Sequence, residues 1–256
     1  LAAEFAGAGF DTLVAAGGDG TVNEVLNGLC DTPGALARTR LAVIPLGTVN
    51  VFAKEMGIPM DLAGAWRVAR SGRDHLVDLP CAEFAGFRGG RERRHFALMA
   101  GAGLDSRAIA LVNWELKKRV GPLAYVWAGV QAMRPPHPQV VVSLGGESPV
   151  TDRVELAEIG NGRYYGGRFP VFPRARLDDG EFDVTLFPQV TWPRAFAVFL
   201  RLLFNRLEHS PHARLLQAKE LTLGADTSVP FHLDGDIVGY LPATLTLQPR
   251  ALRVIA

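Results

Sequence analysis

Short apolar runs alternate with amphipathic helical patterns along the first seventy residues. The runs at 12–16 and 41–46 each end in a glycine-containing turn. Apolar residues then recur with the ~3.6-residue period of a helix, at Val22, Val25, Leu26 and Leu29 and again at Val49, Phe52, Ala53 and Met56. A third helix is expected from the cap Asp61 to about Gly72. Strands that alternate with helices form a parallel sheet, so the chain is predicted to open with an α/β domain.

The pattern changes near residue 75, where runs rich in β-branched and aromatic residues follow one another between Gly, Asp and Pro. Strands are predicted at 75–79, 96–100, 140–144, 153–159, 182–187, 221–223, 231–233, 244–247 and 252–255. Helical patterns interrupt them at 116–133 and 194–207. The sequence therefore predicts an α/β domain over residues 1–75 and a mainly antiparallel β domain over residues 76–256.

Composition narrows the classes of function. Lys and Arg number 27 against 26 Asp and Glu, a formal net charge of +1. A nucleic-acid-binding domain usually carries a basic stripe, so no nucleic acid partner is expected. Cys30 and Cys81 form no close pair, which is typical of free thiols in a reducing cytosol. No window approaches the ~20 apolar residues of a membrane span. A cytoplasmic protein is predicted.

A glycine-rich loop, Gly17-Gly18-Asp19-Gly20-Thr21, ends the first predicted strand and opens the first helix. Adjacent glycines let the backbone approach a ligand, and a helix start offers free N–H groups and partial positive charge, which together bind phosphate. Thr21 and Glu24 predict a capping box, and Asp19 is a candidate to help hold Mg²⁺. A tight turn is the alternative, but the second turn at Gly47 favours a nucleotide site.

Several motifs occur in the order typical of one family of enzymes, and together they resemble the catalytic domain of diacylglycerol kinases and related lipid kinases. The most specific are G-G-D-G-T-V-N-E-V-L-N-G-L at 17–29 and P-L-G-T-V-N-V-F-A at 45–53. Later matches are G-A-G-L-D at 101–105, G-N-G-R-Y-Y-G-G at 160–167, L-D-D-G-E-F-D at 177–183 and L-D-G-D at 233–236. The resemblance implies a phosphofructokinase- or NAD-kinase-like parallel sheet, incomplete at its N-terminal end, followed by a β-sandwich.

The resemblance also implies ligands. The nucleotide-phosphate loop would consist of Gly17, Gly18, Asp19, Gly20, Thr21, Val22 and Asn23, and Gly47 and Thr48 would lie against ATP. A structural Mg²⁺ would be held by the Asp179 side chain and by the carbonyls of Arg176 and Glu181, a set of oxygens suited to a hard cation. From the residues alone, Asp178-Asp179-Gly180 is equally typical of a hairpin turn.

The family places catalytic carboxylates in the D-G-D turn, which here is Asp234-Gly235-Asp236. A kinase that acts on a hydroxyl needs a base or an orienting carboxylate. Asp-Gly between two strands is also the preferred sequence of a two-residue hairpin. Most relatives carry Glu at the second acidic position, where this chain has Asp236, so the choice of base between Asp234 and Asp236 stays open.

Two features bear on the membrane. The pattern at 192–207 combines aromatic and aliphatic residues with Arg194, Arg201 and Arg206, as in a helix that rests on a membrane or one that covers a core. Lys117, Lys118 and Arg119 form a basic cluster that faces either anionic lipid or solvent. Peripheral contact of a cytoplasmic protein with the membrane is expected, and a homodimer is compatible with the sequence.

The sequence thus predicts an ATP- and Mg²⁺-dependent lipid kinase that phosphorylates diacylglycerol first of all, with phosphatidylglycerol or sphingoid bases as other acceptors. The alternatives are an NAD kinase-like enzyme, which shares G-G-D-G-T, and a non-catalytic nucleotide- or lipid-binding module. Only sixteen residues precede Gly17, whereas a βαβ beginning needs about 30 or more. We therefore expect the chain, which starts at Leu1, to be a fragment.

Overall fold

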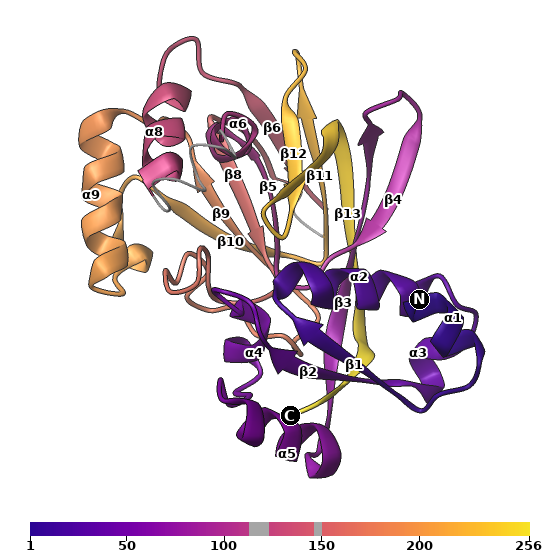
Figure 1. Cartoon of the computed structure of the whole chain (residues 1–256). Helices are drawn as coiled ribbons and strands as arrows, with labels where there is room; N and C mark the ends of the chain where they lie inside the picture. The colour runs from indigo at the N-terminus through magenta and orange to yellow at the C-terminus, as the bar shows by residue number, and fades with distance from the viewer. Residues whose placement is uncertain (113–122, 146–149) are drawn as a thin grey trace.

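The computed structural model describes residues 1–112, 123–145 and 150–256 (Figure 1). The first part consists of helices around two strands: α1 (Ala2–Gly7), β1 (Thr12–Gly17), α2 (Asp19–Cys30), α3 (Ala35–Arg38), β2 (Arg40–Pro45), α4 (Val51–Glu55) and α5 (Leu62–Ser71). β1 and β2 pair in parallel. The predicted α/β beginning is confirmed, and Asp61 caps α5 by accepting a hydrogen bond from the N–H of Gly64.

The rest of the chain is mainly antiparallel, as predicted. Its strands and helices are β3 (Asp74–Gly86), β4 (Arg91–His95), β5 (Met99–Gly103), α6 (Leu104–Ala110), α8 (Leu123–Ala132), β6 (Val140–Leu144), β7 (Val150–Val154), β8 (Leu156–Gly160), β9 (Phe182–Phe187), α9 (Trp192–Leu203), a 3₁₀ turn (Leu207–His209), β10 (Arg214–Ala218), β11 (Glu220–Ala225), β12 (Pro230–Leu233) and β13 (Asp236–Ile255). The strand order is β10-β9-β8-β5-β12-β13-β11-β6-β7.

Two long strands run through both parts of the molecule. β13 pairs antiparallel with β3 from Gly239 opposite Gly86 to Ile255 opposite Asp74, with two irregularities in register. Near its end, β13 also pairs in parallel with β2. Figure 1 shows the sandwich strands and the N-terminal α/β layer at opposite ends of this β3–β13 pair. The division of the chain at residue 75 stays a prediction.

Two hydrophobic cores correspond to the two parts. The first packs α2 and α4 on β1 and β2 and includes Leu26, Leu41 and Phe52. The second fills the sandwich and includes Phe96 and Phe182, whose rings stack with centroids 6.2 Å apart. Within the described residues, no helix combines the length and apolar character needed to cross a membrane.

Some predicted elements differ from the structure. The strand expected at 96–100 begins only at Met99, because the backbone N–H groups of Ala97 and Leu98 donate to Asp234 instead of to a neighbouring strand. The run at 153–159 divides into β7 and β8. The helix expected at 116–133 is described from Leu123 as α8. Lys117, Lys118 and Arg119 lie outside the described residues.

Candidate active site

The two glycine turns after β1 and β2 touch each other. Parallel pairing brings Gly17 opposite Pro45, so both turns leave the same edge of the sheet. A Cβ atom on Gly47 would lie 2.5 Å from the Cα of Gly18, a contact that only glycine permits. Gly20 and Thr21 are exposed at the start of α2, and Thr48 is exposed in the second turn. The predicted phosphate-binding positions therefore gather around one exposed helix N-terminus.

The side chain of Asp19 serves the second turn. Its two carboxylate oxygens accept hydrogen bonds from the N–H groups of Val51 and Phe52 at 3.0 and 2.9 Å, which caps the N-terminus of α4. Asp19 is thus held at a helix end, where a negative charge is stabilising. The predicted capping box is wrong: α2 begins at Asp19 with Gly18 as its N-cap and has no side-chain cap. Glu24 instead forms an ion pair with Arg94.

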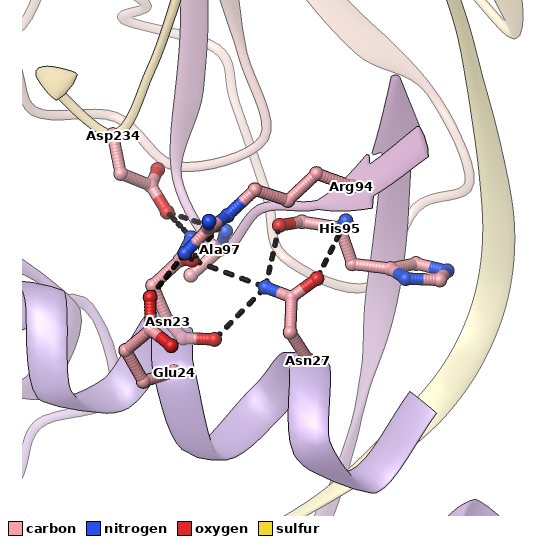
Figure 2. A network of polar contacts seen from close by, with 7 residues as sticks. All are labelled: Asn23, Glu24, Asn27, Arg94, His95, Ala97 and Asp234. Carbon is pink, nitrogen blue, oxygen red and sulfur yellow. Dashed lines mark hydrogen bonds and ion pairs between the residues drawn. The ribbon is translucent and has the colours of Figure 1, made fainter. Parts of the chain in front are cut away.

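A polar network joins α2 to the β sandwich, as Figure 2 shows. Asn27 exchanges two hydrogen bonds with the backbone of His95, both of 2.9 Å. The amide of Asn23, which is buried, donates to Asp234 Oδ2 at 2.7 Å, and its oxygen accepts from Arg94. The asparagines of the N-E-V-L-N stretch therefore link the two parts of the molecule.

Asp234 is held by backbone N–H groups. Its oxygens accept from Ala97, Leu98 and Met99 at 2.8–3.0 Å, in addition to Asn23. Asp234 and Gly235 have φ of 48° and 88°, and Leu233 pairs with Asp236, so the D-G-D stretch is indeed a two-residue hairpin turn. Burial raises the pKa of the Asp234 carboxyl above its usual value, although these hydrogen bonds act to lower it.

Asp236 differs from Asp234 in its surroundings. It is the first residue of β13 and is exposed. The hairpin thus carries one carboxylate whose acceptors are used within the protein and one that faces solvent. The two carboxylates predicted for catalysis have different structural roles.

The G-N-G-R-Y-Y-G-G stretch docks against α4. Glu55, near the end of α4, accepts hydrogen bonds from the N–H groups of Arg163 and Tyr164 at 2.5 and 2.8 Å. Lys54 donates to the carbonyl of Gly167 at 3.2 Å. The buried Asn161 donates to the carbonyl of Ala97, beside the Asp234 contacts. This loop therefore connects α4 to the segment that holds Asp234.

The predicted metal residues lie in the loop before β9. Asp179 is exposed, and its Oδ1 accepts from the N–H of Glu181 at 3.2 Å. Partial burial and the nearby charges of Asp78 and Glu181 raise the pKa of the Asp179 carboxyl. A carboxylate among like charges, next to backbone carbonyls, is a suitable environment for a hard cation. The residues present therefore fit Mg²⁺.

Asp78 is a residue of this region that sequence reasoning missed. It is buried on β3 and accepts hydrogen bonds from the N–H groups of Gly180 and Arg250, both at 2.7 Å. It thus ties the D-D-G loop to β13. An ionisable residue inside the apolar run at 75–79 was the available signal, because a carboxylate is rarely buried without partners.

An apolar cavity of about 300 Å³ lies beside α9. α9 contributes Ala195, Val198, Phe199 and Leu202, and the facing wall includes Phe169, Val171 and Phe187. Two carboxylates, Asp105 and Glu158, also line it. A mainly apolar cavity with a few polar groups is typical of a small-molecule site.

These carboxylates form a cluster with His232. The Nε2 of His232 lies 2.6 Å from Asp105 Oδ2 and 3.8 Å from Glu158 Oε2, and the imidazole is fully buried on β12. A side chain on Gly101 would collide with all three. It is the one group of three or more His, Cys, Asp or Glu ligand atoms within 4.8 Å in the described part of the chain. The sequence did not indicate it, because the three residues come from separate motifs.

The charges within this cluster depend on one another. Burial opposes ionisation of His232, but the neighbouring carboxylates raise its pKa to about 10. Burial likewise opposes ionisation of Asp105, but the charge of His232 holds the pKa of Asp105 below its usual value. Burial and the charge of Asp105 raise the pKa of Glu158 well above its usual value. The cluster is therefore an Asp105–His232 ion pair, and Glu158 keeps its proton to a higher pH than an ordinary carboxyl group.

Comparisons with known proteins cover nearly the whole chain. The diacylglycerol kinase catalytic domain matches residues 1–82. The YegS C-terminal NAD kinase beta sandwich-like domain matches residues 99–256. The protein named diacylglycerol kinase in Staphylococcus aureus (strain JH9) is 32% identical over 250 residues, which are 96% of this chain and 75% of that protein.

Solved structures are also similar. A crystal structure of a diacylglycerol kinase from Bacillus anthracis str. Sterne shares 25% identity with a TM-score of 0.74, covering 99% of this chain and 81% of that one. Yeast NADH kinase complexed with NADH is 13% identical with a TM-score of 0.52, over 96% of this chain and 60% of that one, a likeness of fold alone. The two family models and the identity to the Staphylococcus aureus protein show that this chain belongs to the diacylglycerol kinase family.

Proposed function

We propose that this chain is an ATP-dependent lipid kinase that transfers the γ-phosphoryl group to a lipid hydroxyl, with diacylglycerol as the leading acceptor. The observation that carries the proposal is the 2.7 Å hydrogen bond between Asn23 and Asp234. It joins the helix that starts at the glycine loop to the acidic turn of the other part of the chain. Phosphoryl transfer depends on phosphate-binding donors and a carboxylate held together at one centre.

The nucleotide would bind through the backbone of residues 17–23, with Gly47 and Thr48 against it. The exposed start of α2 supports this role, because helix N-termini present N–H groups and partial positive charge to phosphate. The carboxylate of Asp19 and the amide of Asn23 already have protein partners. These two residues would therefore act by fixing the loop, and their backbone rather than their side chains would face the phosphates.

Asp236 is the proposed base, and Asp234 positions it. Asp234 accepts four hydrogen bonds within the protein, whereas Asp236 is exposed two residues later. In the proposed reaction Asp236 accepts the proton of the lipid hydroxyl, the hydroxyl oxygen bonds to the γ-phosphorus, and ADP leaves with the bridging oxygen. Asp234 holds the turn and thereby fixes the position of the Asp236 carboxylate.

A structural Mg²⁺ would be held by the Asp179 carboxylate and the carbonyls of Arg176 and Glu181. When bound, Mg²⁺ supplies positive charge that offsets the clustered carboxylates of the loop and, with ATP, the charge of the phosphates. Asp78 links this loop to β13 and so connects the metal loop to the strand that starts at Asp236. The loop would stabilise the orientation of the catalytic strand.

Asp179→Asn tests the metal assignment. A cation that binds only the folded protein stabilises it, so Mg²⁺ should raise the melting temperature of the wild-type protein more than that of this variant. Asp226→Asn is the matched control, because Asp226 forms an exposed ion pair with Arg153 and lies outside the proposed metal loop. Equal Mg²⁺-induced increments in wild type and Asp179→Asn would contradict the assignment.

The lipid would place its apolar part in the cavity beside α9, with peripheral contact between protein and membrane. The apolar lining of that cavity supports a lipid over a dinucleotide, and the likeness to NADH kinase is one of fold. A non-catalytic binding module would have no use for an exposed carboxylate at the acidic turn. These points favour a lipid kinase over both alternatives.

Transfer of labelled phosphate from ATP to a short-chain diacylglycerol in detergent micelles tests the proposal. Asp236→Asn should lower turnover by ~10²–10⁴-fold, the usual contribution of a positioned base. Calorimetric affinity for ATP should remain, because the nucleotide would bind through the other part of the chain. Asp236→Glu, which restores the longer acid of most relatives, should retain most of the activity.

The outcomes separate the functions. Absence of transfer by the wild-type protein, with ATP bound, would favour the binding module. Transfer to NAD rather than to lipid would favour the NAD kinase-like alternative. Full lipid kinase activity in Asp236→Asn would remove Asp236 as the base.

A further inference from the structure

Helix α9 carries an unusually apolar exposed surface. None of its residues is buried. Trp192, Phe196 and Leu203 are 56%, 63% and 44% exposed, and Phe204, directly after the helix, is 72% exposed. Phe199 and Leu200 add to the same surface. Monomeric proteins rarely expose contiguous apolar patches of this kind unless the patch meets a partner or a membrane.

The helix has two apolar faces with different surroundings. Ala195, Val198 and Leu202 line the cavity that we assign to the lipid. With ~3.6 residues per turn, Trp192, Phe196 and Leu203 fall together on another side of the helix. Phe199 belongs to both, because it lines the cavity and is 45% exposed. The exposed surface and the cavity wall are therefore two sides of one helix, which stands at the outer edge of the sandwich in Figure 1.

The charged residues of α9 and of the turn directly after it are basic, and the first carboxylate that follows is Glu208 in the 3₁₀ turn. Residues 192–206 contain Arg194, Arg201 and Arg206 and no Asp or Glu. Arg168 lies over the ring of Phe169 at 5.3 Å, and that ring contacts Phe199. Within the described ranges, no carboxylate forms an ion pair with Arg201 or Arg206. At ~3.6 residues per turn, Arg194 and Arg201 lie on the side of α9 opposite Trp192, Phe196 and Leu203. The basic groups near the exposed apolar surface are therefore Arg168 and Arg206, which are both exposed. Exposed basic residues next to an apolar helix face are complementary to an anionic bilayer surface.

We infer that α9 is the segment by which this protein docks on an anionic lipid bilayer, with Phe196, Leu200 and Leu203 in the headgroup region. Docked in this way, the helix has lipid on its outer face and the cavity on its inner face, so a lipid passes from one to the other along Phe199. This inference rests on the proposed lipid kinase function. Because a lipid substrate comes from a bilayer, we infer that a bilayer, and not a protein, covers the exposed face of α9.

Sedimentation with extruded vesicles, without ATP, tests the docking. Vesicles of phosphatidylcholine alone are compared with vesicles of equal parts phosphatidylcholine and phosphatidylglycerol. The wild-type protein should bind the mixed vesicles more tightly. Phe196→Asp should weaken that binding by at least about tenfold, since it removes a large apolar group and adds a like charge. Arg206→Gln should weaken it by about fivefold, and only on the anionic vesicles.

Leu62→Asp on α5 is the matched control, because Leu62 is 64% exposed, close to the 63% of Phe196, and α5 lies in the N-terminal part, away from α9 in Figure 1. It should bind vesicles like the wild type. Unchanged binding by Phe196→Asp would overturn the inference. So would a dimer that Phe196→Asp dissociates while vesicle binding stays the same, because a second copy would then be what covers α9.

The docking and the proposed function can fail separately. Short-chain diacylglycerol in micelles measures transfer without a bilayer, and vesicle sedimentation measures docking without transfer. If the protein transfers phosphate to diacylglycerol in micelles but Phe196→Asp binds vesicles like the wild type, only the docking is rejected. Docking that depends on Phe196 without any transfer would reject only the kinase function.

Discussion

Two polar clusters on the hairpin of β12 and β13 differ in how fully their buried polar atoms are hydrogen-bonded. At the turn, Asp234 accepts from three backbone N–H groups and from the amide of Asn23. Two residues earlier, His232 meets Asp105 and Glu158. There Asp105 Oδ1, Glu158 Oε2 and His232 Nδ1 have no hydrogen-bond partner among the described residues.

The difference shows how each cluster is used. Around Asp234 one negative charge is balanced by neutral dipoles, three from the backbone of residues 97–99 and one from the Asn23 amide, and the last of these fixes the hairpin against α2. The cluster of His232 brings three ionisable groups together, and its carboxylates stand in the wall of the cavity beside α9. A buried cluster with unpaired polar atoms is costly for stability, and such a cost is more typical of a functional site than of a purely structural contact. The first cluster fixes the position of the hairpin, and the carboxylates of the second lie in the wall of the cavity.

His232→Gln gives the largest expected effect on stability. Removing the cation leaves the Asp105 carboxylate buried without a positive partner, and loss of one member of a buried pair costs about 3–5 kcal/mol in the free energy of unfolding. Urea denaturation at neutral pH measures this loss. His95→Gln is the control, because the network at Asn27 uses the backbone of His95, and its loss should be much smaller.

The pH dependence sharpens this prediction. The pKa of His232 is raised to about 10 in the folded protein, above an ordinary value of about 6.5. Its contribution is therefore fully present below pH ~6.5 and is lost as the pH rises through about 10. The difference between wild type and His232→Gln should shrink accordingly at high pH. A difference that stays constant would show that His232 acts through packing and not through its charge.

Much of the local structure could be predicted from the sequence. The apolar runs at 12–16 and 41–46 and the helical periods after them gave β1, α2 and β2, because these elements bury a face that recurs over a few residues. The N-cap of α5 at Asp61 is likewise a local signal that the sequence contains. The Thr21–Glu24 capping box is absent because the N-cap of α2 is Gly18, three residues earlier, and because Glu24 pairs with Arg94.

The site depended on contacts that no local pattern contains. Asn23 and Asp234 are 211 positions apart, and Asp234 binds the backbone of 97–99, where side-chain identity carries no signal. Asp78 and the cluster of Asp105, Glu158 and His232 escaped notice because their partners come from distant strands. The family resemblance supplied Asp234 and Asp236 as a pair, and the structure was needed to distinguish the held carboxylate from the exposed one.

Asp234→Asn tests the other cluster, with a smaller expected loss of stability. The turn itself should survive, since Asn also adopts the left-handed conformation that Asp234 has at φ 48°. An amide keeps one of the two acceptor oxygens and loses the charge, so we expect a net loss of about 1.5–3 kcal/mol, the size of one hydrogen bond to a charged group. Turnover should also fall, since the strand that begins at Asp236 is then less firmly held, while ATP affinity remains.

Asp236→Asn should have the converse effects. Because Asp236 is exposed, the free energy of unfolding of this variant should change by no more than ~0.5 kcal/mol, although its turnover should fall sharply. Denaturation and phosphate transfer measured on both variants separate a positioning carboxylate from a catalytic one. If Asp234→Asn keeps full stability and full turnover, Asp234 is an ordinary turn residue and the contrast between the two clusters disappears.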